Sequence, residues 1–176
     1  MNTHQVMWIL AVILVLIAGW VDWRTRRIPN WLTVSGFLFG IAANSLLAGW
    51  QGAKSSVEGA GLALLLLLPL VLLRAFGAGD WKLMAAVGAF LGPVLCLLVL
   101  FGSILVSGLM AIVEVMRRGR AVTTFRNMVV LVRGFFSFGL RAHPEISLDN
   151  AKLMKLPFGV AVAVATLVCF LVARFS

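Results

Sequence analysis

The chain has 176 residues, of which 62% are hydrophobic and only 12% are charged, and its mean hydropathy is +1.06. A soluble domain of this length cannot bury so many apolar side chains, so the composition excludes an ordinary soluble fold and predicts a membrane protein in contact with the lipid bilayer. A formal net charge of +9 does not indicate a nucleic-acid partner, because the Lys and Arg residues lie between apolar runs. With two cysteines, Cys96 and Cys169, neither a disulfide framework nor a four-thiolate zinc site can form.

The apolar runs, taken in chain order, predict an all-α polytopic membrane protein with about six transmembrane helices, in a single domain over residues 1–176. The first run has no basic segment before it and ends in Trp20-Val21-Asp22-Trp23, without a small-residue cleavage site. We therefore interpret it as a helix and not as a signal peptide. The expected helices are residues 6–22, 31–49, 58–74, 79–91, 94–115 and 157–174.

The uncharged run from Leu83 to Val113 decides the number of helices. As one helix it would be about 46 Å long, which is too much for one ordinary span. Gly92-Pro93 lies inside it, and proline cannot continue the helical hydrogen-bond ladder, so we divide the run there. The alternative is a single kinked helix and five spans.

The distribution of basic residues predicts the orientation. With six helices, 13 of the 15 Lys and Arg residues fall on one side, and the other side has only Lys54 and Arg174. Since basic residues accumulate in cytoplasmic loops, both termini are expected outside. The long basic loop, about residues 117–155, also contains apolar and aromatic residues, and we expect it to lie in the headgroup region.

Two acidic residues, Asp22 and Asp80, are predicted at the cytoplasmic ends of helices, at or just below the membrane surface. Each alone has a structural interpretation, Asp22 as an interfacial cap paired with Arg26 and Asp80 as a helix N-cap. A carboxylate at membrane depth is costly, however, and is a functional candidate for that reason. Two carboxyls brought close cannot readily both ionise, which is the arrangement of an aspartic-protease dyad.

The residues around Asp80 suggest how this site is shaped. Gly77 and Gly79 have no side chains and would let a substrate backbone or the first helix approach closely. Lys82 could contact substrate or influence the two carboxyls, although an interfacial lysine often only reaches toward water. His4 and His143 do not have metal-ligand spacing, so neither a metal nor any other cofactor is predicted.

Three stretches occur in an order that resembles a known family: Asp22 through Ile28-Pro29-Asn30, Gly77-Ala78-Gly79-Asp80-Trp81-Lys82, and Lys155-Leu156-Pro157-Phe158-Gly159. They resemble the prepilin peptidases, or type IV leader peptidases, which are aspartic proteases of the membrane. The resemblance implies that Asp22 and Asp80 are the catalytic pair. It also implies cleavage of a short basic leader from a prepilin-like membrane protein, at the cytoplasmic face of the bacterial inner membrane.

The chain departs from the bifunctional members of that family, which also methylate the new N-terminus. Their paired Cys-x-x-Cys motifs do not occur here, and the compact form looks like the short peptidases of tight-adherence (Flp-type) pili. Two other functions stay open from the residues alone. One is a non-enzymatic membrane assembly subunit or small transporter whose aspartates organise helices or relay protons. The other is a lipid-modifying transferase, although metal-bound pyrophosphate would need more aspartates.

Overall fold

The computed structural model describes residues 3–73, 76–117 and 157–175, and its regular structure there is helical throughout. The elements are α1 (Thr3–Thr25), α2 (Asn30–Leu72), α3 (Ala78–Arg117) and α5 (Phe158–Phe175). The all-α prediction is therefore confirmed for these residues. The predicted basic loop, apart from its first residue, lies outside them.

The surface of these helices is suited to lipid. Among the described residues, α1, α2 and α3 are long and apolar enough to cross a membrane, and α5 contributes a shorter apolar helix over Phe158–Arg174. Large apolar side chains project from them with little cover, among them Leu46 (85% exposed), Trp50 (80%) and Leu65 (73%). Exposing this much apolar surface to water would be unfavourable in free energy, whereas the apolar core of a bilayer solvates it. The chain is a membrane protein.

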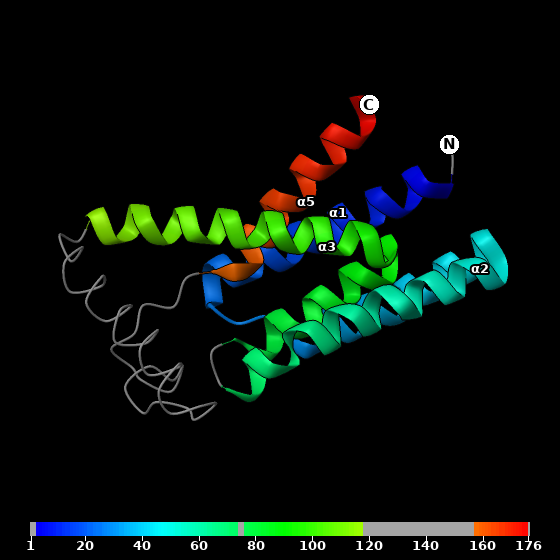
Figure 1. The fold of residues 1–176 in the computed structure, drawn as a ribbon, viewed down its shortest axis with the longest axis horizontal. Helices are drawn as coiled ribbons and strands as arrows, with labels where there is room; N and C mark the ends of the chain where they lie inside the picture. Colours follow the sequence, from blue (N-terminus) through cyan, green and yellow to red (C-terminus); the bar gives the residue numbers. More distant parts are fainter. Residues whose placement is uncertain (1–2, 74–75, 118–156, 176) are drawn as a thin grey trace.

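Both long helices are interrupted by a glycine with positive φ. Gly49 in α2 has φ 60° and Gly92 in α3 has φ 76°, a region that residues with a side chain rarely adopt. At each point the chain turns back, so that α2 and α3 are two helical hairpins (Figure 1). In α3 the reversal brings Cys96 Sγ to 3.8 Å from the carbonyl oxygen of Met84, although twelve residues of straight helix would span about 18 Å.

The break predicted at Gly92-Pro93 is confirmed, whereas the gap predicted between residues 49 and 58 is wrong. The helix resumes at Trp50, directly after the reversal at Gly49. Lys54 and Glu58 lie between the two uncharged runs of this part of the sequence. In the structure they lie one turn apart on the helix surface, where Nζ and Oε1 form an exposed ion pair at 3.7 Å.

Pro93 also explains how the two hairpins are joined. Proline has no N–H, so the carbonyl of Ala89, four residues earlier, has no helical donor. That carbonyl accepts hydrogen bonds from Asn44 Nδ2 at 2.9 Å and Ser56 Oγ at 2.6 Å, one from each arm of α2. Asn44 also donates to the carbonyl of Phe90 at 3.0 Å. Buried polar groups of α2 thus satisfy the backbone that the α3 reversal leaves unpaired.

Helices α1 and α5 pack side by side in opposite directions. At one end Gly159, in the first turn of α5, hydrogen-bonds to Asp22 in the last turns of α1. At the other end the rings of Trp8 and Phe170 are 6.0 Å apart. The start of α1 and the end of α5 accordingly lie at the same end of the molecule (Figure 1). This pairing places the first turn of α5 beside Asp22.

Candidate active site

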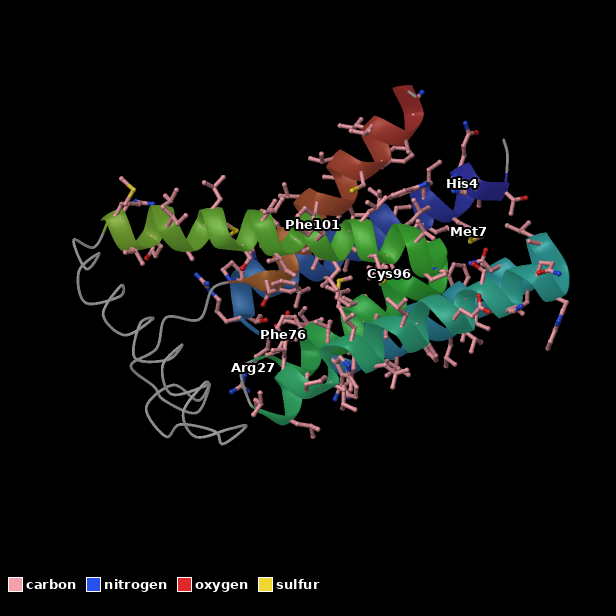
Figure 2. All side chains as sticks on the ribbon, in the orientation of Figure 1. His4, Met7, Arg27, Phe76, Cys96 and Phe101 are labelled. Atoms are coloured by element: carbon pink, nitrogen blue, oxygen red, sulfur yellow. The ribbon has the colours of Figure 1, made fainter. Side chains whose placement is uncertain are left out.

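Asp22 lies near the end of α1 and points into the protein. It is only 5% exposed, whereas the neighbouring Trp20 and Trp23 are 61% and 59% exposed. Exposed tryptophans are typical of the level where a membrane meets water, and between these two the carboxyl of Asp22 is covered by protein. Figure 2 shows Arg27 and Phe76 at this end of the molecule and His4 at the opposite end.

The carboxylate of Asp22 is held by the start of α5. The backbone N–H of Gly159 donates to Asp22 Oδ2 at 2.8 Å. In the first turn of a helix the N–H groups have no partner within the helix, and the positive end of the helix dipole favours a carboxylate. A side chain at position 159 would begin 3.0 Å from Asp22 Cβ, so glycine makes the approach possible. Arg26 is near enough for its charge to act on Asp22.

Asp80 lies in the first turn of α3 and is partly buried. The helix begins after Gly77, whose carbonyl oxygen accepts a hydrogen bond from the N–H of Trp81 at 3.0 Å. The carboxyl of Asp80 lies back over Gly77. A Cβ added at Gly77 would be only 2.7 Å from Asp80 Oδ2. Gly77 thus leaves room for the Asp80 carboxyl itself, whereas the sequence had suggested room for a substrate backbone or for the first helix.

Ile28 packs against the glycines that neighbour the two aspartates. Helix α1 ends where Arg26 adopts φ 54°, and the chain then brings Ile28 inward, where it is 9% exposed. A Cβ on Gly79, the residue before Asp80, would lie 3.3 Å from Ile28 Cβ, and one on Gly159 would lie 3.2 Å from Ile28 Cδ1. Ile28 thus fills the space between the neighbours of both carboxyls. Asp22 and Asp80 are close enough to interact electrostatically.

An aromatic pair also connects the segments that precede Asp80 and Gly159. The rings of Phe76, just before Gly77, and Phe158, just before Gly159, meet edge to face with centroids 4.8 Å apart. Such a pair contributes about 0.5–1.5 kcal/mol beyond its buried area. It ties the segment that begins α3 to the segment that begins α5.

Lys82 lies at this end of the molecule and contacts α2. Its Nζ donates to Asn30 Oδ1 at 3.0 Å, so it joins the starts of α2 and α3. The structure thus brings together Asp22, Asp80, Gly77 and Gly79, while the hydrogen bond of Lys82 is to an amide oxygen and not to either carboxyl.

Sequence reasoning did not assign a role to Gly159, Ile28 or Phe76. A local signal existed for Gly159, because Pro157 stands just before α5 and prolines favour helix starts, where free N–H groups occur. Nothing local paired that helix start with Asp22. Within residues 3–73, 76–117 and 157–175 no group of three or more His, Cys, Asp and Glu side chains gathers. The chemistry that these residues offer at the site is that of two carboxyls and a backbone amide.

The sequence profile of the type IV leader peptidase family matches residues 9–112, more than half of the chain, and the match includes both aspartates. The chain belongs to the type IV leader peptidase family. The family resemblance seen in the sequence is thereby confirmed, and membership makes the chain a membrane peptidase. The match ends before α5, so Gly159 lies outside it. No curated protein and no solved structure matches the chain significantly.

Proposed function

We propose that this type IV leader peptidase family member is an aspartic endopeptidase that removes the short leader of prepilin-like proteins, with Asp22 and Asp80 as the catalytic pair. The observation that supports it best is that two carboxyls from separate helices lie close enough to interact, with Gly159 holding one of them and Ile28 packed between their neighbours. The electrostatic interaction between the carboxyls supports a site in which one is protonated while the other is ionised.

The mechanism needs only these two groups and water. The ionised carboxylate takes a proton from water as the water oxygen attacks the carbonyl carbon of the scissile bond. The protonated carboxyl donates its proton to the carbonyl oxygen, which gives a neutral tetrahedral intermediate. When the C–N bond breaks, the protonated carboxyl gives its proton to the leaving amine and the ionised carboxyl takes a hydroxyl proton from the intermediate, which restores the dyad. The Gly159 hydrogen bond to Asp22 Oδ2 fixes the orientation in which the Asp22 carboxyl takes part in proton transfer.

We place the site at the cytoplasmic face of the bacterial inner membrane, in a single domain with six spans and both termini outside. Arg24 and Arg27 are exposed around Asp22, and Lys82 lies at the same end of the molecule. Basic residues mark the cytoplasmic side, and the exposed tryptophans mark the level of the interface. A cytoplasmic site would meet a leader before its protein is exported.

The substrate we propose is an extended leader joined to an apolar helix, as in pilin-like proteins of Flp-type pili. A peptide inside a continuous helix presents its carbonyls poorly, so the scissile bond should lie just before the helix. The space beside Gly77 is occupied by the Asp80 carboxyl, and the space beside Gly79 is occupied by Ile28. Little room is therefore left near Asp80 for substrate side chains. Glycine before the scissile bond would fit such a site.

The decisive experiment compares Asp22→Asn and Asp80→Asn with Glu58→Gln in a cleavage assay with a purified prepilin-like protein. Asparagine at 22 keeps an oxygen that can accept the Gly159 hydrogen bond, so this variant is expected to fold. Each aspartate variant should lose at least about 10²-fold in rate, the usual contribution of one general acid–base group. Glu58 is an exposed carboxyl paired with Lys54, and its variant should cleave normally. Full activity in either aspartate variant, with all three equally stable to heat, would remove the dyad assignment.

A further inference from the structure

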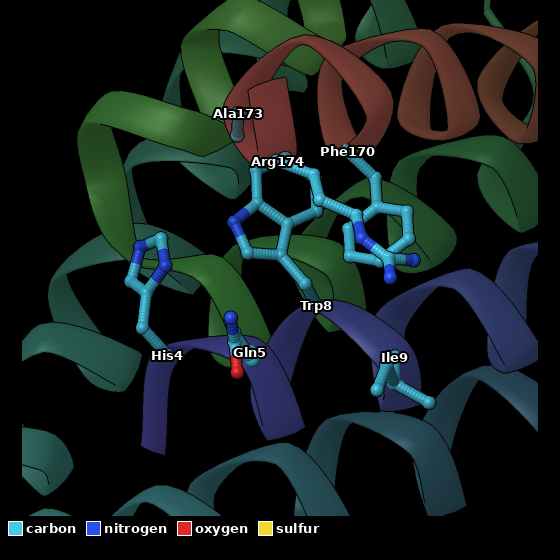
Figure 3. A pocket seen from close by; sticks show the side chains of 7 residues that line it. All are labelled: His4, Gln5, Trp8, Ile9, Phe170, Ala173 and Arg174. Carbon is cyan, nitrogen blue, oxygen red and sulfur yellow. The ribbon is translucent and has the colours of Figure 1, made fainter. Parts of the chain in front are cut away.

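A second polar site lies at the other end of α1 and α5. It is a cavity of about 280 Å³ lined by His4, Gln5, Trp8, Ile9, Phe170, Ala173 and Arg174 (Figure 3). Trp8 and Asp22 are fourteen positions apart in α1, which corresponds to about 21 Å of helix. The cavity is therefore separate from the proposed active site and lies at the opposite membrane level.

The most informative group in this cavity is the indole N–H of Trp8. Trp8 is 2% exposed, and its Nε1 is a buried donor with no hydrogen-bond partner among the described residues. A buried indole N–H usually has a partner, and leaving one unpaired costs about 1–3 kcal/mol. The nitrogen faces the part of the cavity where His4 and Gln5 lie (Figure 3). Ring contacts with His4 and Phe170 hold the indole in place. The N–H is thus a fixed donor that a ligand can satisfy.

The other groups of the cavity define the chemistry of that ligand. Arg174 brings a permanent positive charge with several donors, and His4 and Gln5 add polar side chains. Among the residues that the structure describes, no Asp or Glu lines the cavity. An acceptor with negative charge fits a cavity with this charge, and arginine is a common partner of phosphate oxygens.

The position of the cavity favours a phospholipid headgroup over a free phosphate ion as the ligand. Arg174 is exposed in the last turn of α5, and an arginine at the end of a membrane helix extends its charge to headgroup depth, where phospholipid phosphates are found. Ile9, Phe170 and Ala173 give the cavity an apolar wall, which suits the glycerol and first acyl carbons of a lipid and not a free ion. We propose that this cavity binds the headgroup phosphate of an anionic phospholipid, in the leaflet opposite to the aspartates. The positive charge of Arg174 disfavours the ammonium of a zwitterionic headgroup.

Binding is tested with the full chain in detergent by titration with dioctanoyl phosphatidylglycerol, dioctanoyl phosphatidylcholine and inorganic phosphate, followed by thermophoresis. Trp8→Phe keeps an aromatic ring and removes the N–H, and Arg174→Gln removes the charge. The matched controls are Trp50→Phe, at a ring that is 80% exposed on α2, and Arg117→Gln, in the last turn of α3. Phosphatidylglycerol should bind the unmodified chain best, and Kd should rise at least fivefold in Trp8→Phe and Arg174→Gln but not in the controls.

Three results would overturn the proposal. Unchanged phosphatidylglycerol affinity in both Trp8→Phe and Arg174→Gln would show that lipid binds elsewhere. Equal affinity for inorganic phosphate would make the cavity a site for free anions, and equal affinity for phosphatidylcholine would remove the selectivity for anionic lipid. Arg174 is exposed, so its variant reports binding even if Trp8→Phe folds poorly. The readout is binding alone, so it does not depend on peptidase activity.

Discussion

Replacing Gly159 by alanine tests whether the position of the Asp22 carboxyl controls catalysis. The new methyl group would lie 3.0 Å from both Asp22 Cβ and Asp22 Oδ2, and 3.2 Å from Ile28 Cδ1. Carbon atoms in contact prefer separations of about 3.5–4.0 Å, so Asp22 or the start of α5 must move by roughly half an ångström. A misplacement of about 1 Å can cost on the order of 10²-fold in rate. We therefore expect Gly159→Ala to cleave about tenfold more slowly, which corresponds to about 1.4 kcal/mol in the activation barrier.

The matched control is Gly108→Ala, in α3. A Cβ at Gly108 has no heavy atom within 4 Å, so this variant changes only the helix propensity, by about 0.5–1 kcal/mol in favour of alanine. Initial cleavage rates and thermal unfolding would be measured for both purified variants. If Gly159→Ala cleaves as fast as Gly108→Ala, the contact between α5 and Asp22 does not position a reacting group.

Three further predictions concern packing, orientation and substrate. Gly59→Ala should lower the free energy of unfolding by about 1–3 kcal/mol, because its Cβ would collide with the backbone of Gly88 and Gly92. The control Gly61→Ala, whose Cβ meets nothing within 4 Å, should not lower it. Equal melting temperatures of the two variants would contradict the crossing of α2 and α3. In a cysteine-free background, Lys54→Cys should react with a membrane-impermeant thiol reagent in intact cells and Arg27→Cys only after lysis, and the reverse pattern would overturn the orientation. A prepilin-like substrate with valine in place of the glycine before the scissile bond should be cut at least about tenfold more slowly, as mass spectrometry of the products can measure; indifference to valine would point to a general intramembrane protease.

The course of the chain could be predicted only in part, and the two reversals show why. Gly92 was found because Pro93 follows it, and proline excludes a continuous helix on steric grounds. Gly49 has the same positive φ, but Trp50 follows it and nothing local forbids a helix. The chain has 17 glycines, and among the described residues only these two adopt positive φ. Glycine permits a reversal, but neighbouring groups decide whether one occurs.

The two aspartates of the candidate site can be recognised in the sequence, whereas the helices that surround them cannot. Asp22 and Asp80 are conspicuous, since ionisable residues are rare and costly in apolar helices. Which helices surround them is harder to predict, because in a membrane the buried and lipid-facing positions are equally apolar. Leu83 is fully buried and Leu65 is 73% exposed, yet both are leucines in uncharged runs.

The partner of Asp22 illustrates this limit most clearly. In a soluble protein the polar face of α5 would reveal its orientation, and the neighbour of Asp22 could be inferred from the side that remains apolar. Here α5 has no charged residue between Phe158 and Ala173, so its sequence does not indicate which face meets α1. The group that binds Asp22 is moreover a backbone N–H, which every residue except proline has. What distinguishes Gly159 is the missing side chain, and that matters only after Asp22 and Ile28 have been placed beside it. The carboxyls can therefore be found from residue type, whereas the group that holds one of them follows only from the packing of α1 against α5.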